Sequence, residues 1–392
     1  MRAVDSLHKA ILPGQTIGII GGGQLGRMLA LAAKNAGYKI AVLDPTPQSP
    51  CGQIADYEIT AGYNDIEALK KLAEYSDVIT FEFENINGEA LAWLTEHAYV
   101  PQGAHLLRIS QNRIIEKQTI RDAGGQVAPY AVVKDRHGLT DAVAAIGFPC
   151  VLKTATGGYD GKGQYVLKEE KDIPSAEALL QHGDCVLEAW VPFDKEISVI
   201  VARNVSGQTA VFPVAENIHC DNILHQSIVP ARISPETEKQ AVKQAVEIAD
   251  FTGLVGLLAV EMFVTQNGQI YINELAPRPH NSGHYTMEAC ETSQFEQHIR
   301  AVCNWKLGNT ALLKPVVMVN LLGEHLGRLM DRIPDLSDWK IHLYGKAEAK
   351  EKRKMGHVNL LRESIDEALK EADRSLIWEK SQHTNIGGTI HD

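Results

Sequence analysis

Residues 153–164 read KTATGGYDGKGQ, a lysine at the end of an apolar strand followed by a loop with four glycines. A loop this rich in glycine can close over phosphates and offer them backbone N–H donors. Lys153 supplies a point charge for an inner phosphate, and Lys162 can reach an outer one. The Walker A pattern G-x-x-x-x-G-K-[ST] is absent. The segment therefore predicts a phosphate-binding lid, and the alternative is a mobile hairpin loop without a ligand.

Towards the C-terminus, the apolar segments 258–264 and 269–274 flank Asn267 and Gly268. An Asn-Gly pair favours a two-residue type I′ turn. In that register Glu261 lies directly opposite Glu274, with Cβ atoms roughly 4.5–5.5 Å apart. Two like charges at this separation repel, and Mg²⁺, which suits carboxylates together with nucleotide phosphates, would remove the conflict. The alternative is a solvated pair on an exposed face.

Residues 186–192, VLEAWVP, lie between these two motifs and run from an apolar strand into a turn. Backbone at such a junction can hydrogen-bond the edge of an adenine. Glu188 could accept a hydrogen bond from the adenine amino group, and Glu196 could hold a ribose hydroxyl. Taken alone, each carboxylate is more often a surface charge.

The N-terminal part opens with TIGIIGGGQLG at residues 16–26, a short apolar strand followed by G-x-G-x-x-G. A helix over 25–36 and a second strand over 39–43 complete a βαβ unit, which predicts a parallel sheet. Asp44 ends the second strand, where a dinucleotide site keeps its ribose-binding carboxylate. This segment alone leaves three interpretations open: a dinucleotide site, another phosphate ligand, or a tight turn without a ligand.

Composition limits the classes of function. The 392 residues suggest two or three domains, and the formal charge of −11 makes a general nucleic-acid binder a poor interpretation. Anionic substrates must then be held by a local positive site. The six cysteines form no C-x-x-C pair. Neither a signal peptide nor a membrane-spanning apolar run is evident, so we expect a cytoplasmic protein without nucleic-acid or membrane partners.

In this order the motifs resemble the ATP-grasp superfamily over nearly the whole chain. Five segments together are similar to the N5-carboxyaminoimidazole ribonucleotide synthetases of bacterial purine synthesis: GGGQLGRML (21–29), TFEFENI (80–86), GGYDGKGQ (157–164), NELAPRPHNSGHYT (273–286) and RKMGHVNL (353–360). The resemblance implies an ATP-dependent carbon–nitrogen ligase of de novo purine biosynthesis. Its reaction carboxylates the exocyclic amine of 5-aminoimidazole ribonucleotide with ATP and bicarbonate, via carboxyphosphate, and releases ADP and phosphate.

The resemblance also implies a mixed α/β and α+β fold. It predicts an N-terminal Rossmann-like preATP-grasp domain over 14–110 and an ATP-grasp domain over 111–310 with a mobile lid at about 126–192. A small C-terminal β domain follows over 311–385. The same resemblance, and nothing in the composition, implies a homodimer.

By position in the family's motifs, the residues expected to bind ATP are Arg113, Lys153, Gly158, Tyr159, Asp160, Gly161, Lys162, Gly163, Gln164, Glu188, Ala189, Trp190, Val191, Glu196, His219, Asn273 and Glu274. Glu261 and Glu274 would hold Mg²⁺ or Mn²⁺. Other carboxylating ATP-grasp enzymes often have Asn two residues after the metal glutamate, where this chain has Ala276. The resemblance therefore provides two protein carboxylates for the metal.

The expected catalytic residues are Lys153, Arg278 and Asp160. Lys153 would neutralise charge on the transferred phosphoryl group, and Arg278 would anchor bicarbonate or carboxyphosphate. Asp160 would position or deprotonate the substrate amine, or else be only a turn residue of the loop.

The ribonucleotide is expected to contact side chains from all three domains, polar or basic except for one leucine: Gln24, Leu25, Glu82, Glu84, Asn85, Asn281, Ser282, His284, Lys346, Arg353 and Lys354. The last three would clamp the 5′-phosphate. For His284, a catalytic base and a structural histidine are both open.

Three other functions remain open at this point. A formate-dependent glycinamide ribonucleotide transformylase would share the ATP-grasp fold, but residues 276–286 and the short C-terminal part favour the carboxylating enzyme. An NAD-dependent oxidoreductase would use the first glycine loop and leave the second loop unexplained. A non-catalytic nucleotide sensor would bind Mg·ATP without turnover.

Overall fold

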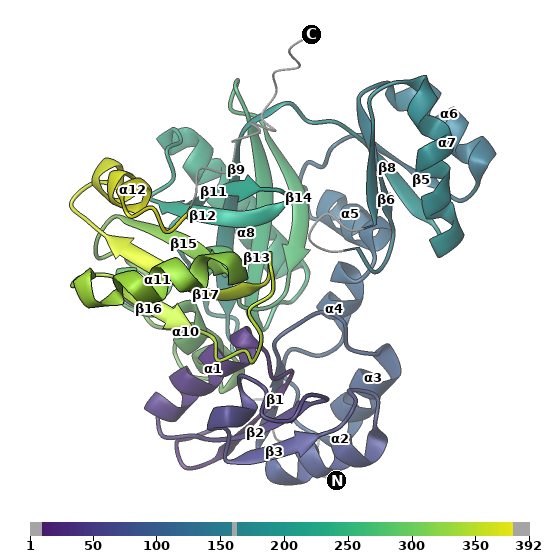
Figure 1. Cartoon of the computed structure of the whole chain (residues 1–392). Coiled ribbons are helices and arrows are strands. Elements are labelled where there is room, and N and C mark those ends of the chain that lie inside the picture. The colour runs from purple at the N-terminus through teal and green to yellow at the C-terminus, as the bar shows by residue number, and fades with distance from the viewer. Residues whose placement is uncertain (1–9, 159–162, 379–392) are drawn as a thin grey trace.

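The structure is a computed structural model that describes residues 10–158 and 163–378 (Figure 1). An N-terminal domain lies at the bottom of the view, and a small sheet with its own helices stands apart at the upper right. A large sheet lies above the N-terminal domain in this view and includes the C-terminal strands. The fold is therefore the predicted mixture of α/β and α+β parts.

The N-terminal domain is built on a parallel sheet in the order β3-β2-β1-β4. Its strands are β1 (Thr16–Ile20), β2 (Lys39–Asp44), β3 (Tyr57–Thr60) and β4 (Val78–Phe81). Its helices are α1 (Gln24–Asn35), α2 (Ile66–Tyr75) and α3 (Gly88–His97). Strand β1 is fully buried, as expected for a central parallel strand covered on both faces. The predicted βαβ opening is confirmed.

Two short helices lead from this domain to the next. The sequence predicts one polar helix over 110–123, whereas the structure has α4 (His105–Ser110) and α5 (Arg113–Asp122). The helix breaks at Asn112, whose side chain accepts hydrogen bonds from the backbone N–H groups of Ile114 and Ile115. This N-cap fixes the start of α5.

The small sheet is antiparallel, in the order β5-β8-β6-β7, and we call it the lid sheet. Its strands are β5 (Tyr130–Val133), β6 (Cys150–Thr154), β7 (Gln164–Leu167) and β8 (Cys185–Ala189). Helices α6 (Arg136–Ile146) and α7 (Ile173–Ala176) accompany it. A separate apolar core lies between this sheet and its helices, so the lid sheet packs largely on itself.

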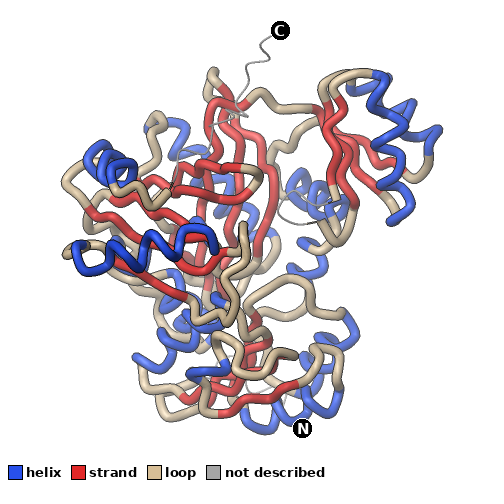
Figure 2. Tube along the Cα trace, in the orientation of Figure 1, coloured by secondary structure: helices blue, strands red, loops and turns tan. Residues whose placement is uncertain are grey.

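The large sheet runs in the order β14-β13-β9-β11-β12-β15-β17-β16, with β10 beside β9. Its strands are β9 (Phe193–Arg203), β10 (Thr209–Val211), β11 (Ala215–Cys220), β12 (Ile223–Val229), β13 (Gly256–Thr265), β14 (Ile270–Ala276), β15 (Val316–Leu322), β16 (Lys340–Leu343) and β17 (Lys354–Leu361). Strands β12 and β15 pair directly. The C-terminal strands thus continue the ATP-grasp sheet, as the unbroken run of strands in Figure 2 shows.

Helices cover this sheet and join it to the N-terminal domain. They are α8 (Pro235–Phe251), α9 (Thr286–Ala289), α10 (Gln294–Val302), α11 (Leu326–Arg332) and α12 (Ile365–Arg374). Helix α8 packs against β9 and β13, and α10 contacts both β13 and α1. Phe295 and Ile299 of α10 belong to the apolar core around β1. This shared core holds the N-terminal domain against the large sheet.

Candidate active site

Protein carboxylates occupy the first glycine loop. The backbone N–H groups of Gly23 and Gly26 donate to the two carboxylate oxygens of Glu82, the second at 2.5 Å. Gly22 N–H donates to Asp44 Oδ2 at 2.7 Å. A Cβ atom added at Gly23 would lie 2.6 Å from Glu82 Oε1, so glycine permits this close approach. The positive end of α1 is therefore neutralised from within the protein.

This arrangement contradicts the dinucleotide interpretation. The N–H groups that would bind a pyrophosphate already donate to Glu82 and Asp44. Asp44 also accepts from Tyr63 Oη at 2.8 Å and from Thr46 N–H, so its oxygens are engaged. Burial, with Asp44 nearby, raises the pKa of Glu82. Gln24 and Leu25 follow at the start of α1, both half-buried.

The carboxylate hairpin of β13 and β14 pairs Glu261 with Glu274, as predicted. The predicted two-residue turn is wrong. Val264 pairs with Ile270, and Thr265 N–H donates to Gln269 O at 3.0 Å, which leaves a three-residue loop. A β-bulge beside Glu261 then restores the register.

The bulge lies in β14 and leaves Asn273 without a cross-strand partner, because Met262 pairs with Ile272 and Glu261 with Glu274. Asn273 and Glu274 are consecutive in the chain, yet both are half-buried, whereas their neighbours Ile272 and Leu275 are buried. Bulges re-aim side chains in this way beside active sites. The two polar side chains of the motif can thereby face the same region.

The two carboxylates of the hairpin differ in their electrostatics. Burial alone would raise the pKa of Glu261, but the hydrogen bond from His280 Nε2 at 3.0 Å and the nearby positive groups lower it to about 2. The Glu274 side chain is 42% exposed. Desolvation and the charges of Glu261 and Glu84 nevertheless raise its pKa, although Arg113 Nη1 lies 3.4 Å from Glu274 Oε2.

This donor set fits a hard divalent cation. Glu261 and Glu274 pair across the hairpin, and the charge of Glu261 contributes to the raised pKa of Glu274. Mg²⁺ commonly binds through one or two carboxylates plus phosphate oxygens and waters. Glu261 and Glu274 are the residues that would hold it.

Lys153 lies at the end of β6 and shares Glu188 with a second lysine. Lys153 Nζ is 3.2 Å from Glu188 Oε2, and Lys117 Nζ from α5 is 3.0 Å from the same oxygen. Burial lowers the pKa of Lys153, and Glu188 opposes that shift. Burial would raise the pKa of Glu188, but the two lysines lower it. The result is a desolvated group with one net positive charge.

Glu188 begins a strand-to-turn segment that includes Ala189, Trp190 and Val191. Ala189 N–H donates to Pro129 O at 2.8 Å and Trp190 N–H to Pro149 O at 3.2 Å, so backbone contacts fix this junction. In the large sheet, Glu196 Oε2 lies 3.1 Å from His219 Nδ1. Burial would lower the pKa of His219, but Glu196 raises it.

Arg278 connects two domains. Its Nε donates to Glu84 Oε1 at 2.6 Å, which joins the segment after β14 to the loop after β4. Its Nη1 also contacts Pro279 O at 3.2 Å. Glu84 belongs to the TFEFENI segment, whose Glu82 caps α1 and whose Asn85 is exposed. The structure thus brings the predicted bicarbonate residue next to the predicted ribonucleotide residues.

The NSGH segment is more buried than its predicted contact role requires. Ser282 and His284 are fully buried. Ser282 Oγ bonds to Ser198 Oγ at 2.7 Å, and His284 Nδ1 contacts Gln294 Nε2 at 3.1 Å. Burial holds the pKa of His284 well below its usual value. This surrounding favours the structural interpretation of His284 over a catalytic base.

Asn281, the first residue of that segment, is half-buried. It exchanges two side-chain hydrogen bonds with Asn320 of β15, at 3.0 and 2.9 Å. The pair links the 3₁₀ turn Asn281–Gly283 to the C-terminal strands.

The basic loop, residues 344–354, approaches the N-terminal domain. Gln53 Nε2 donates to Gly345 O at 2.8 Å, and Lys346 Nζ donates to Lys354 O at 2.6 Å. Burial, followed by the charges of Arg353 and Lys354, lowers the pKa of Lys346 to about 8. Glu82 acts on the same amine in the opposite direction. The loop therefore concentrates positive charge beside the first glycine loop.

Part of the predicted set lies outside the described residues: Tyr159, Asp160, Gly161 and Lys162. Gly158, Gly163 and Gln164 border that gap. Three further side chains lie at the site but are absent from the predicted set: Glu116, which accepts from Leu275 N–H at 2.7 Å, Lys117 beside Glu188, and His280 beside Glu261. Lys117 and Glu116 lie four and three residues after Arg113, and that helical spacing is the signal that could have found them.

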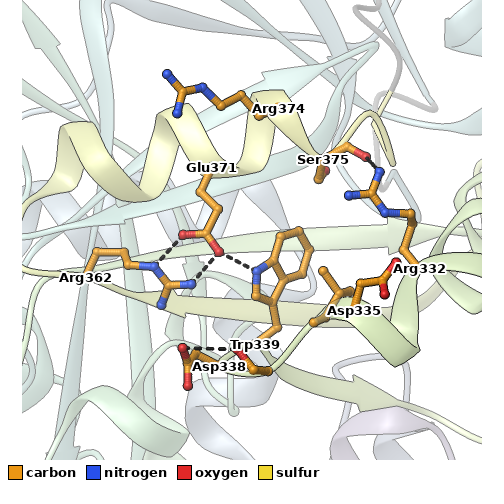
Figure 3. Close-up of a pocket in the computed structure, with 10 residues that line it drawn as sticks. Arg332, Asp335, Asp338, Trp339, Arg362, Glu371, Arg374 and Ser375 are labelled. Atoms are coloured by element: carbon orange, nitrogen blue, oxygen red, sulfur yellow. Dashed lines mark hydrogen bonds and ion pairs between the residues drawn. The ribbon is translucent and has the colours of Figure 1, made fainter.

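A peripheral cavity of about 250 Å³ lies in the C-terminal domain (Figure 3). Several of its polar groups already bond to protein atoms. Glu371 pairs with Arg362 and accepts from Trp339 Nε1 at 2.6 Å, and Arg332 Nη1 donates to Ser375 O at 3.1 Å. The residues drawn in Figure 3 are not among the predicted site residues.

Comparison with protein families assigns the three regions. The ribonucleotide synthetase preATP-grasp domain matches residues 14–111, the ATP-grasp domain 118–295, and the phosphoribosylaminoimidazole carboxylase C-terminal domain 316–371. The N5-carboxyaminoimidazole ribonucleotide synthase of Bacillus subtilis (strain 168) is 58% identical over 362 residues, which cover 92% of this chain and 95% of that relative. The chain belongs to the N5-carboxyaminoimidazole ribonucleotide synthase family.

Solved structures of family members agree with this assignment. An ADP complex of N5-carboxyaminoimidazole ribonucleotide synthetase has a TM-score of 0.93 and 61% identity, and the match covers 94% of this chain and 98% of that one. The synthase of Aspergillus clavatus in complex with ADP and 5-aminoimidazole ribonucleotide has a TM-score of 0.87 at 28% identity, with coverage of 94% and 98%. The family places this chain among the ATP-grasp ligases of purine biosynthesis.

Within residues 10–158 and 163–378, no helix combines the length and the apolar character needed to cross a membrane.

Proposed function

We propose that this chain carboxylates the exocyclic amine of 5-aminoimidazole ribonucleotide to N5-carboxyaminoimidazole ribonucleotide, using ATP and bicarbonate and releasing ADP and phosphate. The observation that carries the proposal is the end-to-end similarity to synthases of that name, at 58% identity over 92% of the chain. The site geometry supports it, because the same chain contains groups suited to ATP, in the lid sheet and the carboxylate hairpin, and a basic loop suited to a second phosphate. The relatives also favour carboxylation over the formate-dependent alternative.

ATP would lie between the lid sheet and the carboxylate hairpin. Lys153 and Arg113 would meet its phosphates, the backbone of residues 188–191 its base, and Glu196 with His219 its ribose. The carboxylate of Glu188 is buried against Lys117 and Lys153, which does not fit its expected role as acceptor for the adenine amino group. A divalent metal at Glu261 and Glu274 would neutralise charge on the transferred phosphoryl group when bound, and Mg²⁺ suits this site because it binds carboxylates together with phosphates. The bulge that exposes Asn273 and Glu274 together supports their shared role.

Arg278 would hold bicarbonate for in-line attack on the γ-phosphorus. A bicarbonate oxygen bonds to phosphorus as the bond to the ADP oxygen breaks, which gives carboxyphosphate. Arg278 is suited to this because its fork can bind a carboxylate while Glu84 holds its Nε. Closure of residues 158–164 would exclude water, which hydrolyses carboxyphosphate.

The ribonucleotide would bind between the first glycine loop and the basic loop. Lys346, Arg353 and Lys354 would hold its 5′-phosphate, and Glu82 and Asn85 would line the pocket with Gln24. The exocyclic amine then attacks the carbon of carboxyphosphate and displaces phosphate, or attacks CO₂ formed when carboxyphosphate has released its phosphate, and the amine loses a proton. Asp160, outside the described residues, stays our candidate to position that amine.

Other expectations remain proposals. The boundaries 14–110, 111–310 and 311–385, with a lid at about 126–192, stand beside the slightly different ranges that the families match. The homodimer and the cytoplasmic location rest on resemblance and sequence. Light scattering coupled to size-exclusion chromatography would test the former.

The test of function is product formation with ¹³C-bicarbonate. We expect one labelled carboxyl group on the ribonucleotide per ADP released, and none without ATP. Activity with formate and glycinamide ribonucleotide instead would contradict the substrate and keep the fold. Nucleotide binding without turnover on either substrate would indicate a sensor.

A further inference from the structure

Lys117 of α5 is a charged side chain in the protein interior. Its side chain is 1% exposed, although it belongs to the short polar helix α5. A buried ammonium group costs free energy unless a partner compensates its charge. Its Nζ forms an ion pair with Glu188 Oε2, at 3.0 Å. Lys117 is therefore not a solvated charge on the helix surface.

The same carboxylate oxygen also serves Lys153, whose Nζ lies 3.2 Å away. Two ammonium groups and one carboxylate leave one net positive charge in a nearly dry region. The other carboxylate oxygen, Glu188 Oε1, is buried and has no hydrogen-bond partner among the described residues. Both cations thus gather on one side of Glu188.

The three groups come from different elements. Lys153 is on β6 and Glu188 on β8, adjacent strands of the lid sheet, whereas Lys117 reaches them from α5. Arg113 N–H donates to Ala155 O at 2.8 Å, which ties the start of α5 to the end of β6. Lys117 Nζ also lies 6.0 Å from the centre of the Tyr130 ring. The side chain of Lys117 is 1% exposed and that of Lys153 is 12% exposed, so Lys153 lies nearer to solvent than Lys117.

We propose that Lys117 is a positioning residue for the nucleotide phosphates: it takes up the charge of Glu188, so that the ammonium of Lys153 stays available for a phosphate oxygen. Without Lys117, Glu188 would pair with Lys153 alone, and the group would lose its net positive charge. The affinity for phosphate would fall, although no contact to the nucleotide had been removed. The inference rests on the proposed function only in taking ATP as the ligand.

Charge-matched variants test this role. Lys117→Met keeps the volume of the side chain but leaves the group neutral. Glu188→Gln keeps an acceptor oxygen, and the double variant Lys117→Met/Glu188→Gln restores one net positive charge. Lys243→Met is the matched control, because Lys243 is an exposed lysine on α8. Calorimetry would give dissociation constants for ATP and AMP with each protein, and thermal unfolding would report folding.

We expect Lys117→Met to weaken ATP binding by at least ~10-fold and AMP binding by no more than about 3-fold, since ATP carries the additional phosphates. The double variant should regain most of the lost ATP affinity. In steady state, Lys117→Met should raise KM for ATP more than it lowers kcat.

An unchanged ATP dissociation constant in a folded Lys117→Met protein would overturn the inference. So would equal losses for ATP and AMP that the double variant does not restore, which would mark a purely structural lysine. Failure of the wild-type chain to bind ATP at all would instead contradict the proposed function.

Discussion

The carboxylate hairpin brings negative charges close together, and the basic loop does the same with positive charges. In the hairpin, Glu261 lies opposite Glu274, and desolvation and like charge raise the pKa of Glu274. In the loop, burial and the charges of Arg353 and Lys354 lower the pKa of Lys346 to about 8. In each region, charges of one sign lie close together. They disfavour the charged form of one group, the carboxylate of Glu274 in the hairpin and the ammonium of Lys346 in the loop.

Ion pairs elsewhere in the molecule behave differently. Glu216 accepts from Arg232 Nη2 at 2.6 Å and from Lys195 Nζ at 3.2 Å, and these partners lower its pKa against the effect of burial. Glu216 is a structural ion pair with its charge compensated inside the chain. From this contrast we infer that like charges only partly compensated within the chain, rather than charge or burial alone, mark the regions that bind a ligand of opposite sign.

The largest effect is expected when the hairpin loses a metal-binding carboxylate. Glu274→Gln removes a ligand and also the repulsion with Glu261. The rate of ADP release in the presence of 5-aminoimidazole ribonucleotide should fall by ~10²-fold or more, because a bound metal contributes several kcal/mol to stabilising charge in the transition state. The melting temperature without metal should rise, since one member of a like-charge pair is gone. A variant that is both inactive and less stable than wild type would contradict this electrostatic reading.

In the basic loop, Lys346→Met should give the next largest effect. We expect KM for the ribonucleotide to rise by roughly 10–100-fold, in line with the loss of one charge-assisted phosphate contact. KM for ATP should change by less than about 2-fold, because the ATP site uses other side chains. Initial-rate kinetics over both substrates would measure the two constants. Equal increases in both constants would mean that the loop does not distinguish the substrates.

The pH dependence sharpens the same point. The ammonium of Lys346 exists below its folded pKa of about 8 and is lost above it. If that charge binds the 5′-phosphate, kcat/KM for the ribonucleotide should fall as pH rises through about 8. Lys346→Arg keeps its charge to much higher pH, so its profile should lose this fall. A profile that is the same in the two proteins would assign the titration to another group.

The smallest effect is expected at the exposed end of the loop. Arg353→Met should raise KM for the ribonucleotide only about 2–5-fold, because solvent and salt screen an exposed charge. The wild-type advantage should shrink further at high ionic strength. An effect as large as that of Lys346→Met, or one independent of salt, would show that Arg353 is desolvated when substrate binds.

Much of the fold could be predicted because local patterns determine it. The βαβ opening follows from the order of apolar strands and helix, and the pairing of Glu261 with Glu274 agrees with the one predicted from the hairpin pattern. The turn itself was predicted wrongly, because a three-residue loop and a bulge in β14 offset each other. The loop shifts the register by one residue and the bulge shifts it back, so the sequence pattern reveals neither.

Burial of individual polar side chains was harder to predict. Ser282 and His284 are expected substrate contacts from the sequence, and both side chains are fully buried in the structure. Lys117 looks like a surface charge on a polar helix and is fully buried. These outcomes depend on contacts between segments far apart in the chain: Ser282 bonds to Ser198 of β9, Asn359 of β17 donates to His284 O, and Lys117 of α5 pairs with Glu188 of β8. The local pattern does not encode such contacts.

The most direct test of the account is the initial rate of ADP release over a grid of Mg·ATP and 5-aminoimidazole ribonucleotide concentrations, for wild type, Glu274→Gln and Lys346→Met. We expect strong stimulation by the ribonucleotide in the wild type. Lys346→Met should be stimulated only at much higher ribonucleotide concentration, and Glu274→Gln should stay slow throughout the grid. A wild-type rate that is indifferent to the ribonucleotide, or a Lys346→Met protein that matches wild type, would contradict the division of labour between the two regions.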